Sequence, residues 1–179
     1  MPMSPHRRGV LRGAIGLAGA TLLGGTARAA AVAPRSLSLL NLHTGEALKA
    51  TYFEAGEYLP DAMAALNHLL RDFRTGDVHP IAPGLLDLVT SLQGRLDTCR
   101  TVHVISGYRS PHTNAQLHER SDGVASHSLH MVGEAMDIRI PGVELANLRD
   151  AALGLQRGGV GYYPGSDFVH VDVGRVRRW

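Results

Sequence analysis

Apolar and polar positions follow two different periods in the first half of the folded region. Residues 35–53 alternate apolar and polar side chains around Thr44-Gly45, which predicts a β-hairpin. Apolar residues then recur every three or four positions, which predicts one helix beginning at Pro60 and another after Pro83. The apolar positions of these helices are Met63, Leu66, Leu69, Leu70 and Phe73 in the first, and Leu85, Leu88, Val89, Leu92 and Leu96 in the second.

The second half of the chain is richer in predicted strands. Residues 101–106 and 134–140 are short segments typical of strands, and residues 158–174 predict a closing hairpin interrupted by glycines. Residues 142–155 predict a third helix. Because the first two helices precede most of the strands, we expect an α+β fold: a single compact domain with helices packed on a small antiparallel sheet.

Residues 1–29 have the features of an export signal. They combine a basic start, an apolar middle over residues 10–23 and an Ala-Arg-Ala pattern at 27–29, which together predict a signal peptide. Arg7-Arg8 favours the twin-arginine type, with an ordinary secretory signal as the alternative. We therefore expect a folded domain over residues 30–179, exported to the periplasm or cell envelope.

Loss of this signal changes the net charge. The whole sequence has 18 Lys and Arg against 16 Asp and Glu, and residues 1–29 hold four of the arginines and no acid. Residues 30–179 therefore carry 14 basic and 16 acidic side chains, a net charge of −2, which argues against nucleic acid as a partner. We expect no membrane association unless the signal is retained as an anchor. The single cysteine, Cys99, excludes an internal disulfide.

Two of the predicted strands place ionisable side chains opposite an apolar stripe. In residues 168–173, alternating valines put His170 and Asp172 together on the other face. Asp137 has the same relation to the isoleucines and methionine of residues 134–140. His130 precedes Asp137 by a segment in which Gly133 permits a tight turn. His130, Asp137 and His170 could supply the three ligands of a catalytic zinc site, although their spacing alone also fits a solvated polar face.

Three segments resemble motifs of the zinc D-Ala-D-Ala carboxypeptidase family. "SLHMVGEAMD" fits the pattern Ser-x-His-x-x-Gly-x-Ala-x-Asp, and "DFVHVD" resembles the later segment that carries the second ligand histidine. "ISGYRSPHTNAQL" resembles the arginine-bearing loop, and the three motifs occur in the family's order. Residues 35–179 as a whole are similar to the murein endopeptidase branch. The resemblance implies the compact α+β fold shared with hedgehog zinc-binding domains, one Zn²⁺ per chain and peptidoglycan peptide stems as the substrate.

The resemblance also implies roles for individual residues. The zinc ligands would be His130, Asp137 and His170. Arg109 matches the arginine that holds a substrate carboxylate or carbonyl oxygen, a task that suits a planar guanidinium. Asp167 stands three positions before His170, where related enzymes have a glutamate as general base. Because aspartate is shorter than glutamate, Asp172 is an alternative candidate for the general base. If Asp172 is not the base, its role would be to orient a ligand imidazole. We prefer Asp167 as the base.

These assignments predict a zinc-dependent murein hydrolase that uses a metal-activated water as its nucleophile. Asp167 would take the proton of the water, and Arg109 would stabilise the developing oxyanion. The bond cut would be a cross-link between stems, either D-Ala–diaminopimelate or diaminopimelate–diaminopimelate. The alternatives are a D,D- or L,D-carboxypeptidase that trims stems, and a non-catalytic zinc-containing module that binds the cell wall. His127 is expected at the rim of the cleft.

Overall fold

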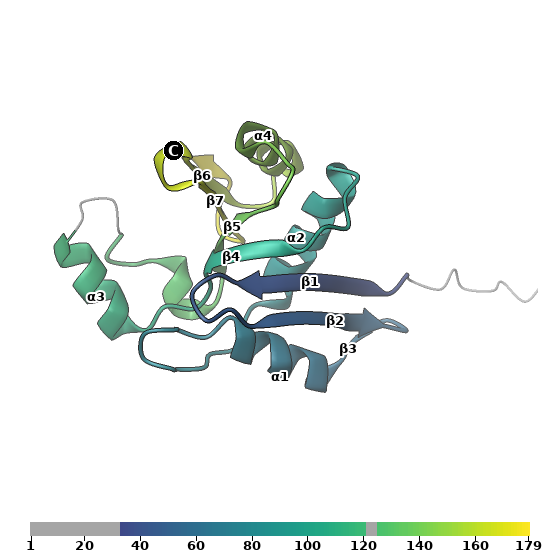
Figure 1. Cartoon of the computed structure of the whole chain (residues 1–179), viewed down its shortest axis with the longest axis horizontal. Coiled ribbons are helices and arrows are strands. Elements are labelled where there is room, and N and C mark those ends of the chain that lie inside the picture. The colour runs from purple at the N-terminus through teal and green to yellow at the C-terminus, as the bar shows by residue number, and fades with distance from the viewer. Residues whose placement is uncertain (1–32, 121–124) are drawn as a thin grey trace, which may run out of the picture. The chain divides into compact units, whose positions relative to one another are not determined.

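The computed structural model describes residues 33–120 and 125–179 (Figure 1). The predicted signal peptide lies outside the described residues. None of the helices in the described ranges has the length and apolar character needed to cross a membrane.

The predicted elements of the first half are confirmed, although the first helix ends at Leu69, before Leu70 and Phe73, and the second ends at Arg95, before Leu96. The hairpin consists of β1 (Arg35–Asn41) and β2 (Ala47–Glu54), which pair antiparallel, and the short strand β3 (Glu57–Tyr58) pairs with the end of β2. The two helices are α1 (Pro60–Leu69) and α2 (Pro83–Arg95), each beginning at the proline that marked it in the sequence.

The second half also contains the predicted elements. The strands are β4 (Val102–Ser106) and β5 (Ala135–Arg139), followed after α4 (Leu145–Leu155) by β6 (Gly159–Tyr163) and β7 (Phe168–Asp172). The last two pair antiparallel as the predicted closing hairpin, joined by the 3-10 turn η2 (Pro164–Ser166). A short strand β8 (Arg177–Arg178) then runs parallel to β6.

The α+β prediction is confirmed, but the sheet is larger than expected and is mixed. Its strands lie in the order β3-β2-β1-β4-β5-β7-β6-β8. The pairs β1–β4 and β6–β8 are parallel. The connection permits the first of these, since the chain passes from β1 through β2, β3 and two helices before β4 and can re-enter the sheet in the direction of β1.

Helices α1, α2 and α4 pack against this sheet (Figure 1). Their buried leucines and the inward residues of the central strands form one apolar cluster. In β5 and β7 the contributors are Met136, Ile138, Val169 and Val171, all fully buried. Because side chains alternate along a strand, the residues between them face away from this cluster.

The sequence analysis missed the short strands β3 and β8, the turn η2 and two further elements that bear on the site. Helix α3 (Pro111–Arg120) has almost no apolar residues, so its sequence contains no helical stripe. Its start could have been recognised from Ser110, whose Oγ accepts a hydrogen bond from the Thr113 N–H at 3.2 Å, followed by Pro111. The second is the 3-10 turn η1 (Leu129–Val132), which contains His130.

Candidate metal centre

Strands β5 and β7 form one wall of the site. Asp137 on β5 lies directly opposite His170 on β7 in the antiparallel register. Because their strand neighbours point into the apolar cluster, both side chains project from the other face of the sheet. The predicted division of the two strands into an apolar and an ionisable face is confirmed.

The turn η1 brings His130 to the same point from the other side. The Ser128 Oγ accepts a hydrogen bond from the His130 N–H at 3.4 Å, and Gly133 ends the turn with a φ of 69°. A Cβ atom at Gly133 would overlap the carbonyl oxygen of Pro80. Glycine is therefore required here both for backbone conformation and for space.

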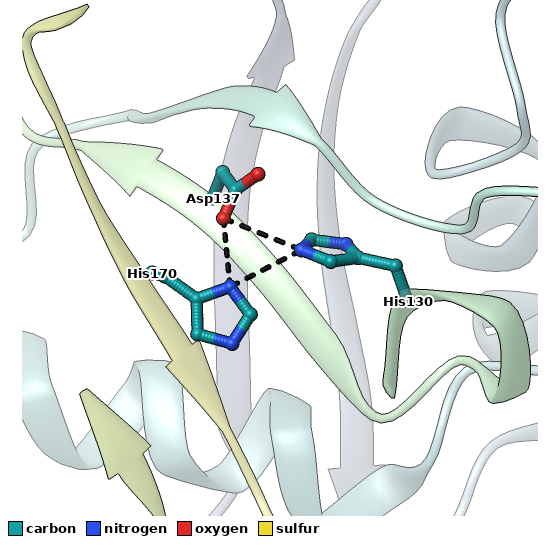
Figure 2. A group of neighbouring side chains, drawn as sticks. All are labelled: His130, Asp137 and His170. Carbon is teal, nitrogen blue, oxygen red and sulfur yellow. Dashed lines mark hydrogen bonds and ion pairs between the residues drawn. The ribbon is translucent and has the colours of Figure 1, made fainter. Parts of the chain in front are cut away.

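His130, Asp137 and His170 converge at single atoms (Figure 2). The Asp137 Oδ1 lies 2.9 Å from the His170 Nδ1 and 3.3 Å from the His130 Nε2, and these two nitrogens are 3.2 Å apart. All three residues are buried. Two imidazole nitrogens and a carboxylate oxygen at this spacing could hold a metal ion.

The second nitrogen of each imidazole lies within hydrogen-bond distance of an acceptor outside the cluster. The His130 Nδ1 lies 2.7 Å from the Gly107 carbonyl oxygen, and the His170 Nε2 lies 3.1 Å from the Asp172 Oδ2. Since both partners are acceptors, the His130 Nδ1 and the His170 Nε2 can carry the N–H of a neutral imidazole, and the His130 Nε2 and the His170 Nδ1 could then offer lone pairs to a metal ion. Ligand histidines in metal sites have this arrangement, so the donor set fits a cation.

The electrostatics of the cluster favour positive charge. Burial would raise the pKa of Asp137, but the charge and hydrogen bonds of His130 and His170 outweigh it and hold this pKa well below its ordinary range. Burial likewise opposes a charge on His170, yet the hydrogen bonds to Asp137 and Asp172 raise the pKa of the imidazole. The carboxylates of Asp137 and Asp172 therefore favour positive charge at His170.

Asp172 is buried behind His170. Besides the imidazole, it accepts hydrogen bonds from the backbone N–H groups of Gly159 and Gly174, each at 2.9 Å. The guanidinium of Arg177 binds both of its oxygens, at 3.0 and 2.6 Å. These donors outweigh the effect of burial and hold the pKa of Asp172 well below its ordinary range. The carboxylate is thus saturated with donors and fixes the orientation of His170.

Asp167 has the opposite environment. It ends the turn η2 in a left-handed conformation, with a φ of 54°. Its side chain is 62% exposed and forms an ion pair with Arg139. Its neighbours Ser166 and Phe168 line the pocket into which the cluster opens, and Asp167 is not among the lining residues. Its role as general base remains a prediction.

Arg109 lies beside the cluster. Its backbone N–H donates to the His130 carbonyl oxygen at 3.1 Å, which ties the arginine loop to η1. Its NH2 lies 3.7 Å from the Asp137 Oδ2, and its side chain is only 11% exposed. Burial lowers the pKa of the guanidinium, partly offset by Asp137. The Nε is buried and has no hydrogen-bond partner in the described part of the chain.

The cluster opens into a pocket of about 460 Å³. Arg109 and the three converging residues lie in its wall, and the exposed His127 also lines it, as expected for a rim residue. Arg177 and Trp179 complete the wall on the side of β8. The sequence analysis assigned no role to these two, because "GRVRRW" has no pattern that links it to the histidine motifs.

Comparison with known proteins gives a consistent result. Residues 29–179 match the family model described as Peptidoglycan L,D-endopeptidase MepK. The chain is 51% identical to the Escherichia coli K12 protein of that name over 146 residues, which cover 82% of this chain and 80% of the relative. It is 43% identical to the probable peptidoglycan L,D-endopeptidase MepK of Haemophilus influenzae over 147 residues, 82% of this chain and 79% of that protein.

Proposed function

We propose that this chain, which belongs to the peptidoglycan L,D-endopeptidase MepK family, is a zinc-dependent murein endopeptidase. It would hydrolyse peptide cross-links between the stems of peptidoglycan. One observation carries the proposal. Donor atoms of His130, Asp137 and His170 converge in a pocket, while the second nitrogen of each imidazole is hydrogen-bonded to another acceptor.

Zinc suits this donor set better than a hard cation does, because two imidazoles and one carboxylate are typical ligands of catalytic zinc. When bound, the metal would acidify water and polarise the substrate carbonyl. Gly107 and Asp172 keep both imidazoles in the tautomer that presents a lone pair. Asp172 is assigned this orienting role, since its oxygens already accept five hydrogen bonds.

Arg109 and Asp167 would handle charge and protons during hydrolysis. The guanidinium of Arg109, which lines the pocket beside the three converging residues, can donate to the carbonyl oxygen of the scissile bond as negative charge develops there. Asp167 would accept the proton lost by the attacking water and return it to the leaving amine. For this role the Asp167 carboxylate must leave its ion pair with Arg139 and contact the attacking water.

The names of the relatives narrow the substrate. The term L,D-endopeptidase denotes a bond between an L and a D centre, which is the configuration of a diaminopimelate–diaminopimelate cross-link. We therefore favour this cross-link over D-Ala–diaminopimelate. An envelope location is consistent with this substrate, and we propose that residues 1–29 direct export as a signal of the twin-arginine type.

The test is digestion of purified cross-linked muropeptide dimers by the metal-loaded protein, with and without chelator. Loss of the diaminopimelate-linked dimer, abolished by chelator and restored by Zn²⁺, is the expected result. Release of free D-Ala with the dimers intact would instead indicate a carboxypeptidase. Retention on sacculi without any cleavage would indicate a wall-binding module.

A further inference from the structure

Arg177 is the cationic partner of the buried Asp172, although no motif includes it. It is the first residue of β8, and its side chain is 30% exposed, whereas the Asp172 side chain has no exposed surface. Its NH1 and NH2 donate to the two oxygens of this carboxylate, at 3.0 and 2.6 Å. Two parallel N–H groups match the shape of a carboxylate, so this pair fixes the plane of the Asp172 side chain as well as its position.

The two oxygens of Asp172 are held in different ways. The backbone N–H groups of Gly159 and Gly174 both donate to Oδ1. The other oxygen, Oδ2, is the one that lies 3.1 Å from the His170 Nε2, and in the described part of the chain its only further donor is the Arg177 NH2. Without Arg177, the oxygen that meets the imidazole would therefore lose its one support outside His170 itself.

The chain leaves room for this guanidinium. Gly159 lies beside Arg177 in the parallel register of β6 and β8, and a Cβ at Gly159 would overlap both the Arg177 NH1 and the Asp172 Oδ2. NH1 also donates to the Arg175 carbonyl oxygen at 3.1 Å, and the guanidinium lies 4.8 Å from the centroid of the Trp179 ring. A residue without a side chain at position 159 is thus needed for the contact between Arg177 and Asp172.

We propose that Arg177 is a positioning residue of the metal centre and acts through Asp172. Its NH2 holds the oxygen that accepts the His170 N–H, and this keeps the His170 Nδ1 where it meets the donor atoms of His130 and Asp137. The inference rests on the metal site of the proposed function. It adds the C-terminal strand β8 to the parts of the chain that the site requires.

The experiment measures the zinc affinity of the protein by competition with a chromophoric chelator, and then kcat and KM of the zinc-loaded protein on cross-linked dimers. The variants are Arg177→Gln, Asp172→Asn and the double variant that combines them. The control is Arg178→Gln, which removes the neighbouring, exposed arginine of the same strand. Circular dichroism reports whether each variant is folded.

Arg177→Gln is expected to weaken zinc affinity roughly tenfold, because groups that orient a ligand histidine typically contribute at least this much. Arg178→Gln should bind zinc as tightly as the parent protein. Added to Asp172→Asn, the Arg177→Gln change should weaken affinity by less than about twofold, since an effect that passes through Asp172 is already lost. Arg177 also lines the pocket, but KM of Arg177→Gln should stay within about threefold of the parent value.

Equal zinc affinity of Arg177→Gln and the parent protein would overturn the inference. A loss of the same size in the parent protein and in Asp172→Asn would also overturn it, because Arg177 would then act by another route. A rise in KM at unchanged zinc affinity would do the same, since the guanidinium would then bind substrate directly.

Should Arg177→Gln not fold, Arg177→Lys decides the question, because lysine keeps the charge but not the two parallel N–H groups. A loss of zinc affinity in Arg177→Lys is expected, and the affinity of the parent protein in this variant would overturn the inference. A parent protein that binds no zinc would contradict the proposed function itself, which is a different outcome from equally tight binding by every variant.

Discussion

The two walls of the candidate metal centre are built in different ways. The strand wall, defined by Asp137, His170 and Asp172, lies on β5 and β7, where the ladder of backbone hydrogen bonds fixes each side chain. The loop wall, defined by Arg109 and His130, lies on connections outside the sheet. The two walls contribute to the same site but owe their positions to different parts of the chain.

The loop wall depends on a few hydrogen bonds between segments far apart in sequence. The backbone N–H groups of Tyr108, Arg109 and Ser110 donate in turn to the Leu70 carbonyl, the His130 carbonyl and the Asp72 carboxylate, at 2.7, 3.1 and 2.9 Å. A regular ladder of backbone hydrogen bonds places a ligand through the local sequence pattern, whereas an irregular loop needs individual anchoring contacts. The loop wall should therefore be the easier of the two to disturb without unfolding the protein.

The largest effect is expected from removing one ligand from either wall. His170→Ala and His130→Ala should each lower cleavage of cross-linked dimers on the order of a thousandfold or more, because a metal site with two ligands binds weakly. Zinc content after gel filtration and the rate of dimer loss are the measurements. His127→Ala is the matched control, and loss of zinc from that variant would contradict the assignment.

The next effect concerns Asp167, which belongs to neither wall. Asp167→Asn should lower kcat about a hundredfold through loss of the proton acceptor, with zinc content unchanged. Arg139→Gln is the matched control, since it removes the ion-pair partner and leaves the carboxylate in place. A kcat of Asp167→Asn equal to that of the parent protein would assign the base elsewhere.

Asp172 tests the support of the strand wall. Asp172→Asn should weaken zinc affinity roughly ten- to a hundredfold, because the amide no longer holds the His170 N–H with a charged acceptor. Competition with a chromophoric chelator measures this affinity. If Asp172→Asn binds zinc normally and only kcat falls, Asp172 and not Asp167 is the better candidate for the base.

Gly133 tests the loop wall. Gly133→Ala should lower the free energy of unfolding by roughly 2 kcal/mol, since a Cβ would meet Pro80 and a positive φ is unfavourable for alanine. Urea unfolding measures this loss. Gly45→Ala on the exposed β1–β2 turn has a similar positive φ but no neighbour within 4 Å, so it separates backbone strain from overlap.

The smallest effect concerns pH and the anchor Asp72. Burial would raise its pKa, but hydrogen bonds from Thr113 and from the Ser110 and Arg74 N–H groups lower it below its ordinary value of 3.8. A lowered folded-state pKa means that this stabilisation is complete above 3.8 and is lost as the pH falls through the folded-state value. The stability difference between the parent protein and Asp72→Asn, from urea unfolding, should therefore shrink below about pH 4. A constant difference down to pH 2 would contradict this.

The local sequence patterns determined much of this protein. The period of two in residues 134–140 and 168–173 placed Asp137 and His170 on the ionisable faces of two strands. The periods near three and four predicted α1, α2 and α4, and the histidine motifs identified the family. These features are readable because alternation and helical spacing are properties of neighbouring residues.

Contacts between distant segments decided the rest. Asp167 and Asp172 flank His170 at similar separations in sequence, and only the folded chain shows that one is exposed and the other is enclosed by Arg177 and two backbone amides. The parallel pairing of β8 with β6 likewise brings Trp179 to the metal centre. Burial and charge partners depend on which segments meet in space, so no short stretch of sequence contains that information.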